Sequence, residues 1–96
     1  MNPVTLEINS AIREFEGFRV AYSLQMDSPE HPDSQNDSAI YSILLIQQYG
    51  DDPVEGKLLF DVSRDKSRAE HMFQTFCRCN VLIGNADDVI DELLDR

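Results

Sequence analysis

The feature that most constrains the fold is a change in the spacing of apolar residues near Ser63. Before this point, apolar and polar residues alternate along residues 18–26, which indicates a strand with one buried face. After it, four apolar residues recur at helical spacing: Ala69, Met72, Phe73 and Phe76. A chain whose strands all precede its helices favours an α+β fold, with the helices packed on one face of an antiparallel sheet.

Two further segments before Ser63 have the composition of strands. Residues 39–49 are apolar on both faces and rich in β-branched and aromatic residues, which suits an interior strand covered on both sides. A buried helix is the alternative, and Ser42 and the β propensity argue against it. After turn residues at 50–56, residues 57–62 predict a third strand. Its two alternating sets are Leu58, Phe60 and Val62 against Lys57, Leu59 and Asp61.

The N-terminal segment predicts a fourth strand over about 4–9, because Val4, Leu6 and Ile8 alternate. The chain then turns before residue 18, through a bulge or a single helical turn. Residues 27–38 hold prolines, aspartates and serines but no large apolar residue, and they predict a mobile loop. Strands joined by loops indicate a three- to four-stranded antiparallel meander.

Two helices are expected after the strands, at about 64–79 and 86–95. Ser63 or Asp65 can cap the first helix, and Asn80 can end it. Asn85 can cap the second, whose apolar stripe must dock on the rest of the chain. The stripe consists of Ala86, Val89, Ile90, Leu93 and Leu94. The length of 96 residues favours one domain, 1–96.

Net charge excludes some classes of partner. The chain carries 18 acidic and 8 basic residues, a formal charge of −10, which repels the phosphates of nucleic acids and anionic membranes. The first ten residues lack the basic and apolar regions of a secretion signal, and no apolar run is long enough to span a bilayer. We therefore expect a cytoplasmic protein with reduced cysteines.

The only two cysteines, Cys77 and Cys79, lie one residue apart. On a helix they flank the apolar stripe from opposite sides, about 200° apart, so they can neither pair with each other nor share a metal ion. His71 lies about 240° from Cys77 around the same helix. The cysteines are therefore interpreted as core filler or a lone thiol, and we expect neither to be needed for structure or function.

Other groupings give little support to catalysis or metal binding. The acids of 87–95 follow the solvent face of a helix and lack the spacing of a calcium loop. No sequence motif of a hydrolase, metalloprotease, nucleotide-binding or redox site is present. We expect no enzymatic activity, no cofactor and no metal. A basic cluster, Arg64, Lys66 and Arg68, stands against the acidic C-terminal segment and suggests attraction within the fold or between copies.

Several stretches together resemble a family of small uncharacterised proteins from anaerobic, spore-forming Gram-positive bacteria. The most telling are DVSRDKSRAEHMF, the NV pair at 80–81, and DDVIDELL; the similarity covers roughly residues 18–95. The resemblance implies an α+β fold and a bacterial cytoplasm. It implies no activity, substrate or site residue. This chain has LIGNA where the family has a segment with serine and proline.

The sequence favours a small non-catalytic interaction or regulatory protein. Two helices can cover only one face of a small sheet, so the other face must meet the N-terminal segment, a second copy or a partner protein. The expected interaction surface consists of Ile40, Leu44 and Ile46 with the basic cluster Arg64, Lys66 and Arg68. The opposite side of the same strand carries Tyr41, Ile43 and Leu45. The alternative is a small-molecule or metal-binding domain whose cleft between sheet and helices holds Tyr22, Tyr41 and His71.

Overall fold

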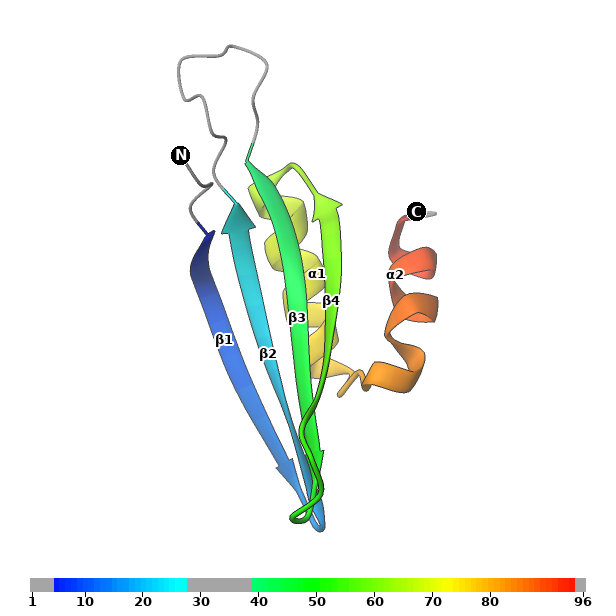
Figure 1. Ribbon diagram of the computed structural model, residues 1–96. Coiled ribbons are helices and arrows are strands. Elements are labelled where there is room, and N and C mark those ends of the chain that lie inside the picture. Colours follow the sequence, from blue (N-terminus) through cyan, green and yellow to red (C-terminus); the bar gives the residue numbers. More distant parts are fainter. Residues whose placement is uncertain (1–4, 28–38, 95–96) are drawn as a thin grey trace.

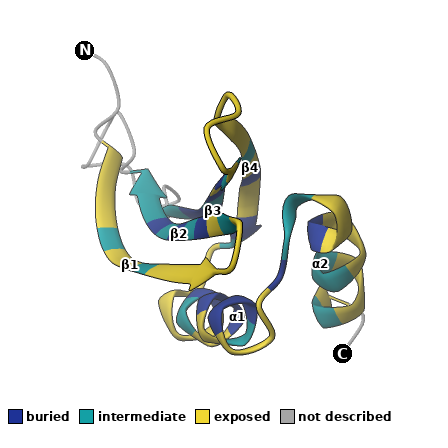
Figure 2. Cartoon of the chain, turned by 90° about the horizontal axis from the view of Figure 1, so that it is seen from below, coloured by how far each residue is buried: buried dark blue, intermediate teal, exposed yellow. Residues whose placement is uncertain are grey.

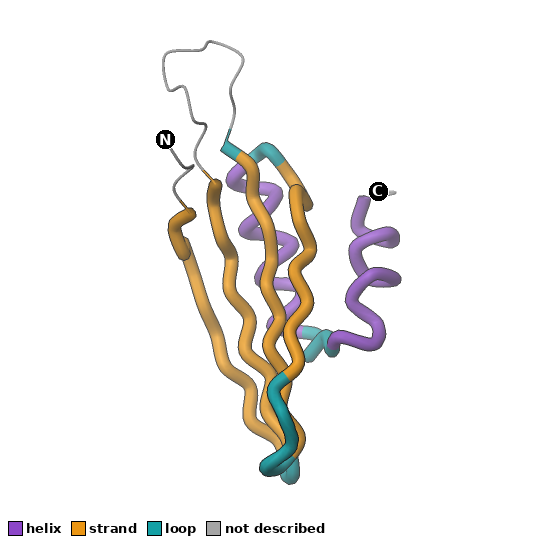
Figure 3. Tube along the Cα trace, viewed as in Figure 1, coloured by secondary structure: helices purple, strands orange, loops and turns teal. Residues whose placement is uncertain are grey.

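The computed structural model describes residues 5–27 and 39–94 and confirms the α+β prediction. Four antiparallel strands form one sheet in the order β1-β2-β3-β4, and the helices follow (Figure 1; Figure 3). Most of the predicted loop, residues 28–38, lies outside the described residues, as do Val4 and the last two residues. The elements are β1 (Thr5–Phe15), β2 (Phe18–Asp27), β3 (Ile40–Tyr49), β4 (Glu55–Ser63), α1 (Lys66–Arg78), η1 (Ile83–Asn85) and α2 (Ala86–Leu94).

Strand β1 is longer than the predicted strand at 4–9 and continues to Phe15. Its pairing with β2 shifts at Ile8, the extra residue of a bulge. A tight turn at Glu16 and Gly17 follows, where Gly17 adopts a φ of 89° that favours glycine. The prediction missed residues 10–15 because this edge strand buries no side chain fully. Backbone pairing with β2, rather than an apolar pattern, holds it in the sheet.

The core lies between the sheet and α1. Val20, Tyr22 and Leu24 of β2 meet Ile43 and Leu45 of β3, and all five are at most 1% exposed. From α1 the core receives the predicted stripe of Ala69, Met72, Phe73 and Phe76. Figure 2 shows α1 lying against one face of the sheet, with the other face uncovered by any helix.

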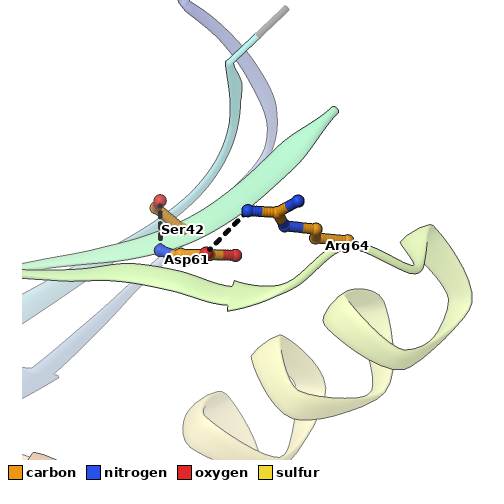
Figure 4. Close-up of polar contacts among 3 residues, drawn as sticks. All are labelled: Ser42, Asp61 and Arg64. Atoms are coloured by element: carbon orange, nitrogen blue, oxygen red, sulfur yellow. Dashed lines mark hydrogen bonds and ion pairs between the residues drawn. The ribbon is translucent and has the colours of Figure 1, made fainter. Parts of the chain in front are cut away.

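Strand β4 differs from the predicted alternation because it contains a bulge. Ile43 pairs with Leu59 and Tyr41 with Ser63, so residues 60–62 together stand opposite Ser42. Asp61 has a φ of 56° there, and its backbone N–H donates to Ser42 Oγ at 3.1 Å (Figure 4). The bulge changes which side chains face the core: Leu59 and Val62 are buried. Placing Val62 in one set with Leu58 and Phe60 was therefore wrong, because the latter two are exposed.

Helix α1 begins and ends within the predicted 64–79. Asp65 is the N-cap residue by position but makes no side-chain capping bond. Its backbone N–H instead donates to Ser63 Oγ at 3.0 Å. At the other end, Asn80 takes a left-handed φ of 52° and Val81 N–H donates to Phe76 O at 3.1 Å. This is the Schellman motif expected when asparagine ends a helix.

Helix α2 is attached more loosely than α1. Ala86 is its one buried residue among those described, and Val89, Ile90 and Leu93 are partly buried against the core. Asn85 does not cap α2, contrary to the prediction, because its Oδ1 accepts a bond from Leu82 N–H at 2.9 Å. In Figure 2, α2 lies beyond β4, beside α1. None of the helices in the described ranges is both long and apolar enough to cross a membrane.

Candidate interaction surface on the open sheet face

The sheet face opposite α1, here called the open face, carries large apolar side chains in contact with solvent. Side chains alternate between the two faces along a strand, so the neighbours of buried residues point to this side. Ile46 of β3 is 40% exposed, and Leu58 of β4 is 51% exposed. Phe60 and Ile12 are more exposed still, at 61% and 64%. The open face is defined by Ile12, Leu44, Ile46, Leu58 and Phe60.

These side chains are neighbours across the strands rather than scattered positions. Leu44 pairs with Leu58, and Ile46 pairs with Ala21, which in turn pairs with Ile12. Residues directly opposite each other have Cβ atoms about 5 Å apart on the same face. A groove of about 480 Å³ follows β1, β2 and β3 along this surface, with Ile12, Leu44 and Ile46 in its lining. The open face is therefore one continuous apolar surface.

Polar side chains border the apolar surface. On the β1 side, Ser23 Oγ donates to Glu7 Oε1 at 2.7 Å, and Gln25 Nε2 donates to Ser23 Oγ at 3.5 Å. On the β4 side, the Arg64 guanidinium lies 3.6 Å from the Asp61 carboxylate (Figure 4). An apolar centre with a polar border is the usual composition of a protein interaction surface.

The structure separates the six residues predicted for the interaction surface. Ile40, Leu44 and Ile46 occupy alternate positions of β3, on the side away from α1. Lys66 and Arg68 are exposed in the first turns of α1, which covers the opposite face. Arg64 lies between the two groups, at the end of β4. Lys66 and Arg68 are therefore not part of the open face, whereas Arg64 lies at its border.

Three open-face residues were missing from the sequence prediction: Ile12, Leu58 and Phe60. Ile12 was missed because β1 was not predicted beyond residue 9. Leu58 and Phe60 were recognised as apolar strand residues, but the bulge at Asp61 could not be read from a pattern with period two. The one sequence signal for this bulge is the aspartate at position 61, because aspartate tolerates a positive φ better than most residues other than glycine.

Tyr22, Tyr41 and His71, predicted for a cleft between sheet and helices, do not converge. Tyr22 is buried, and its hydroxyl donates to Val81 O at 2.7 Å. Burial raises the pKa of Tyr22 to about 12, with a smaller contribution from Cys77 and an opposing one from Arg13. Tyr41 is buried near the start of α1, and His71 is exposed. The space between these three residues is filled with core side chains, so they line no shared cleft.

The two cysteines have different environments. Cys77 is 8% exposed and belongs to the core, whereas Cys79 is exposed at the end of α1. Burial raises the pKa of the Cys77 thiol, which the nearby Arg13 partly offsets, and a protonated thiol is a poor nucleophile. In the part of the chain that the structure describes, no three histidine, cysteine or acidic side chains are grouped to hold a metal ion.

Comparison of this chain with protein-family models, with curated proteins and with solved structures finds no match.

Proposed function

We propose that this chain is a non-catalytic interaction protein whose open face binds an apolar segment of another protein. The observation that carries the proposal is the continuous surface of Ile12, Leu44, Ile46, Leu58 and Phe60 on a sheet face without a helix. Single exposed apolar residues are common, but a contiguous apolar surface with a polar border is typical of a binding site. Burying each of these side chains in a complex would contribute roughly 1 kcal/mol.

The charges around the open face favour a partner with basic residues. Glu7 and Glu14 lie on the open side of β1, and Asp61 lies beside Phe60 on β4. Arg19 of β2 and Arg64 offset only part of this negative charge. A partner segment with lysine or arginine on either side of its apolar residues would complement such a border.

A second copy of the chain fits the open face less well. Each copy carries a formal charge of −10, so two copies facing each other would repel. We therefore infer a different protein as partner rather than a homodimer. We further infer a reducing compartment such as the cytoplasm, since both cysteines are free thiols.

The proposal is tested by selecting short random peptides on the immobilised protein and measuring their dissociation constants by fluorescence anisotropy. We expect the selected peptides to combine apolar with basic residues. Leu58→Asp should weaken their binding at least about tenfold, since it places a charge in the apolar centre. Leu94→Asp is the matched control, because Leu94 of α2 has a similar exposure of 47% against 51% for Leu58.

Two results would contradict the proposal. Equal weakening by both substitutions would show that the peptides bind any exposed apolar residue. A mass that doubles with concentration and returns to the monomer value in Leu58→Asp or Leu44→Asp would assign the open face to a second copy. The anisotropy measurements detect the first result, and sedimentation equilibrium of the wild type, Leu44→Asp and Leu58→Asp detects the second.

A further inference from the structure

A second surface lies where the edge strand β1 meets α1, and its lining is polar and basic, whereas the open face is apolar. A groove of about 560 Å³ runs between them, within the size range of small-molecule sites. Its polar lining comes from the helix side of β1 and from the last turns of α1. The lining includes Asn9, Arg13, Phe73, Gln74, Arg78 and Asn80.

The groove differs in charge from the rest of the molecule. Arg13 and Arg78 are two of the eight basic residues in the chain. The chain has 18 acidic residues, but no acidic residue in the described ranges lines the groove. At physiological ionic strength, exposed charges are largely screened beyond about 8 Å. A ligand in the groove would therefore meet Arg13 and Arg78 more strongly than distant acidic residues, and no described acidic residue lines the groove.

Arg13 uses one of its hydrogen-bond donors within the described part of the fold and leaves its terminal amino groups available. Its Nε donates a long hydrogen bond to the carbonyl oxygen of Cys77 at 3.4 Å, which brings the guanidinium to the end of α1. Within residues 5–27 and 39–94, its terminal amino groups make no further hydrogen bond or ion pair. The same holds for the side chains of Arg78, Gln74 and Asn80. The groove thus presents several hydrogen-bond donors without acceptors.

An apolar wall stands beside these donors. Phe73 is 3% exposed and Cys77 is 8% exposed, and both contribute to the lining. Arginine forks bind planar oxyanions in a bidentate manner, while an apolar wall accepts a carbon skeleton. We infer that this groove binds a small organic oxyanion, with a carboxylate or phosphate group on Arg13 and Arg78. The inference does not depend on the function proposed for the open face.

The simpler interpretation is that both arginines only complement the negative C-terminal end of α1. That interpretation accounts for the bond from Arg13 to the Cys77 carbonyl. It leaves unexplained why the side-chain amides of Gln74 and Asn80 line the groove and why no described acidic residue does. It also predicts that the arginines stabilise the helix and that no anion binds, so the two interpretations can be separated.

The test uses inorganic phosphate, succinate and benzoate as probes, titrated into the full chain at constant ionic strength and followed by ¹H–¹⁵N NMR. We expect saturable shifts at residues 9–13 and 73–80 for at least one probe. Arg13→Gln and Arg78→Gln should each raise its dissociation constant about tenfold, since one charge-assisted interaction is lost. Arg19→Gln is the control, because Arg19 is an exposed arginine of β2 outside this groove.

The inference is overturned if no probe gives saturable shifts, or if Arg19→Gln weakens binding as much as the groove substitutions. The two groove variants guard against misfolding as an explanation, because Arg78 is an exposed helix residue whose substitution should preserve the fold. A lower melting temperature in both, with no binding to the wild type, would instead assign the arginines to helix stabilisation.

Discussion

The two faces of β3 differ in what covers them, although their side chains are similar. Ile43 and Leu45 are fully buried beneath α1, whereas Ile46, one position further along, is 40% exposed. The apolar composition of this strand predicted cover on both sides. The structure supplies that cover on one side only, so apolar composition reports which faces could be buried and not what buries them.

The largest expected effect is a difference in stability between isoleucine-to-alanine substitutions on the two faces of β3. Ile43→Ala should lower the free energy of unfolding by about 2–5 kcal/mol, because it removes a fully buried side chain and leaves a cavity. Ile46→Ala should cost less than about 1 kcal/mol, since Ile46 already faces solvent in part. Urea denaturation followed by circular dichroism measures both. Similar losses would mean that the open face is covered in solution.

The second prediction concerns the bulge that decides which β4 residues face the core. Asp61→Val should lower the free energy of unfolding by about 1–2 kcal/mol, because a β-branched residue is strained at a φ of 56°. Asp61→Asn is the control and should change stability by less than about 0.5 kcal/mol, since asparagine tolerates this conformation and the ion pair with the 62%-exposed Arg64 is weak. If asparagine costs as much as valine, the ion pair rather than the backbone holds the bulge.

The smallest predicted change tests a polar contact on the covered face. Tyr22→Phe should lower the free energy of unfolding by about 1 kcal/mol, because the Val81 carbonyl loses its hydroxyl donor. The pKa of Tyr22 is raised from 10.0 to about 12 in the folded chain, so the unfolded chain loses this proton first. The stabilisation is complete below pH 10 and is lost as the pH rises through about 12.

Urea titrations of the wild type and Tyr22→Phe at several pH values from 8 to about 12 measure this contribution. The difference between the two proteins should shrink across the upper part of the range. A constant difference would show that the Tyr22 hydroxyl keeps its proton equally well in the folded and unfolded chains.

The elements with a strong apolar period could be predicted from the sequence. Strand β2, strand β3 and the stripe on α1 were all predicted close to their observed bounds. Each buries one face, so its apolar residues recur with the period of a strand or of a helix. The antiparallel meander was predicted because consecutive strands are joined by loops rather than by helices. The end of α1 at Asn80 was predictable as well, since few residues other than glycine accept its φ of 52°.

What could not be predicted depends on pairing between strands rather than on any single segment. The extension of β1 to Phe15 rests on hydrogen bonds with β2, and the exposure of Leu58 and Phe60 rests on the register with β3. The groove at Arg13 and Arg78 joins residues 65 positions apart in the sequence, 78 against 13. The resemblance to the family of small bacterial proteins stays a prediction, because no family model matches the chain.

The order of the elements along the chain has a consequence for synthesis. All four strands precede α1, and each strand pairs with the next one in sequence. Such local pairings can form quickly, one hairpin after another, while translation continues. Any strand pairing that forms before α1 is available leaves both apolar faces of the sheet bare. One face gains its cover only when residues 66–78 emerge, so a nascent chain stalled before α1 should be a strong chaperone substrate.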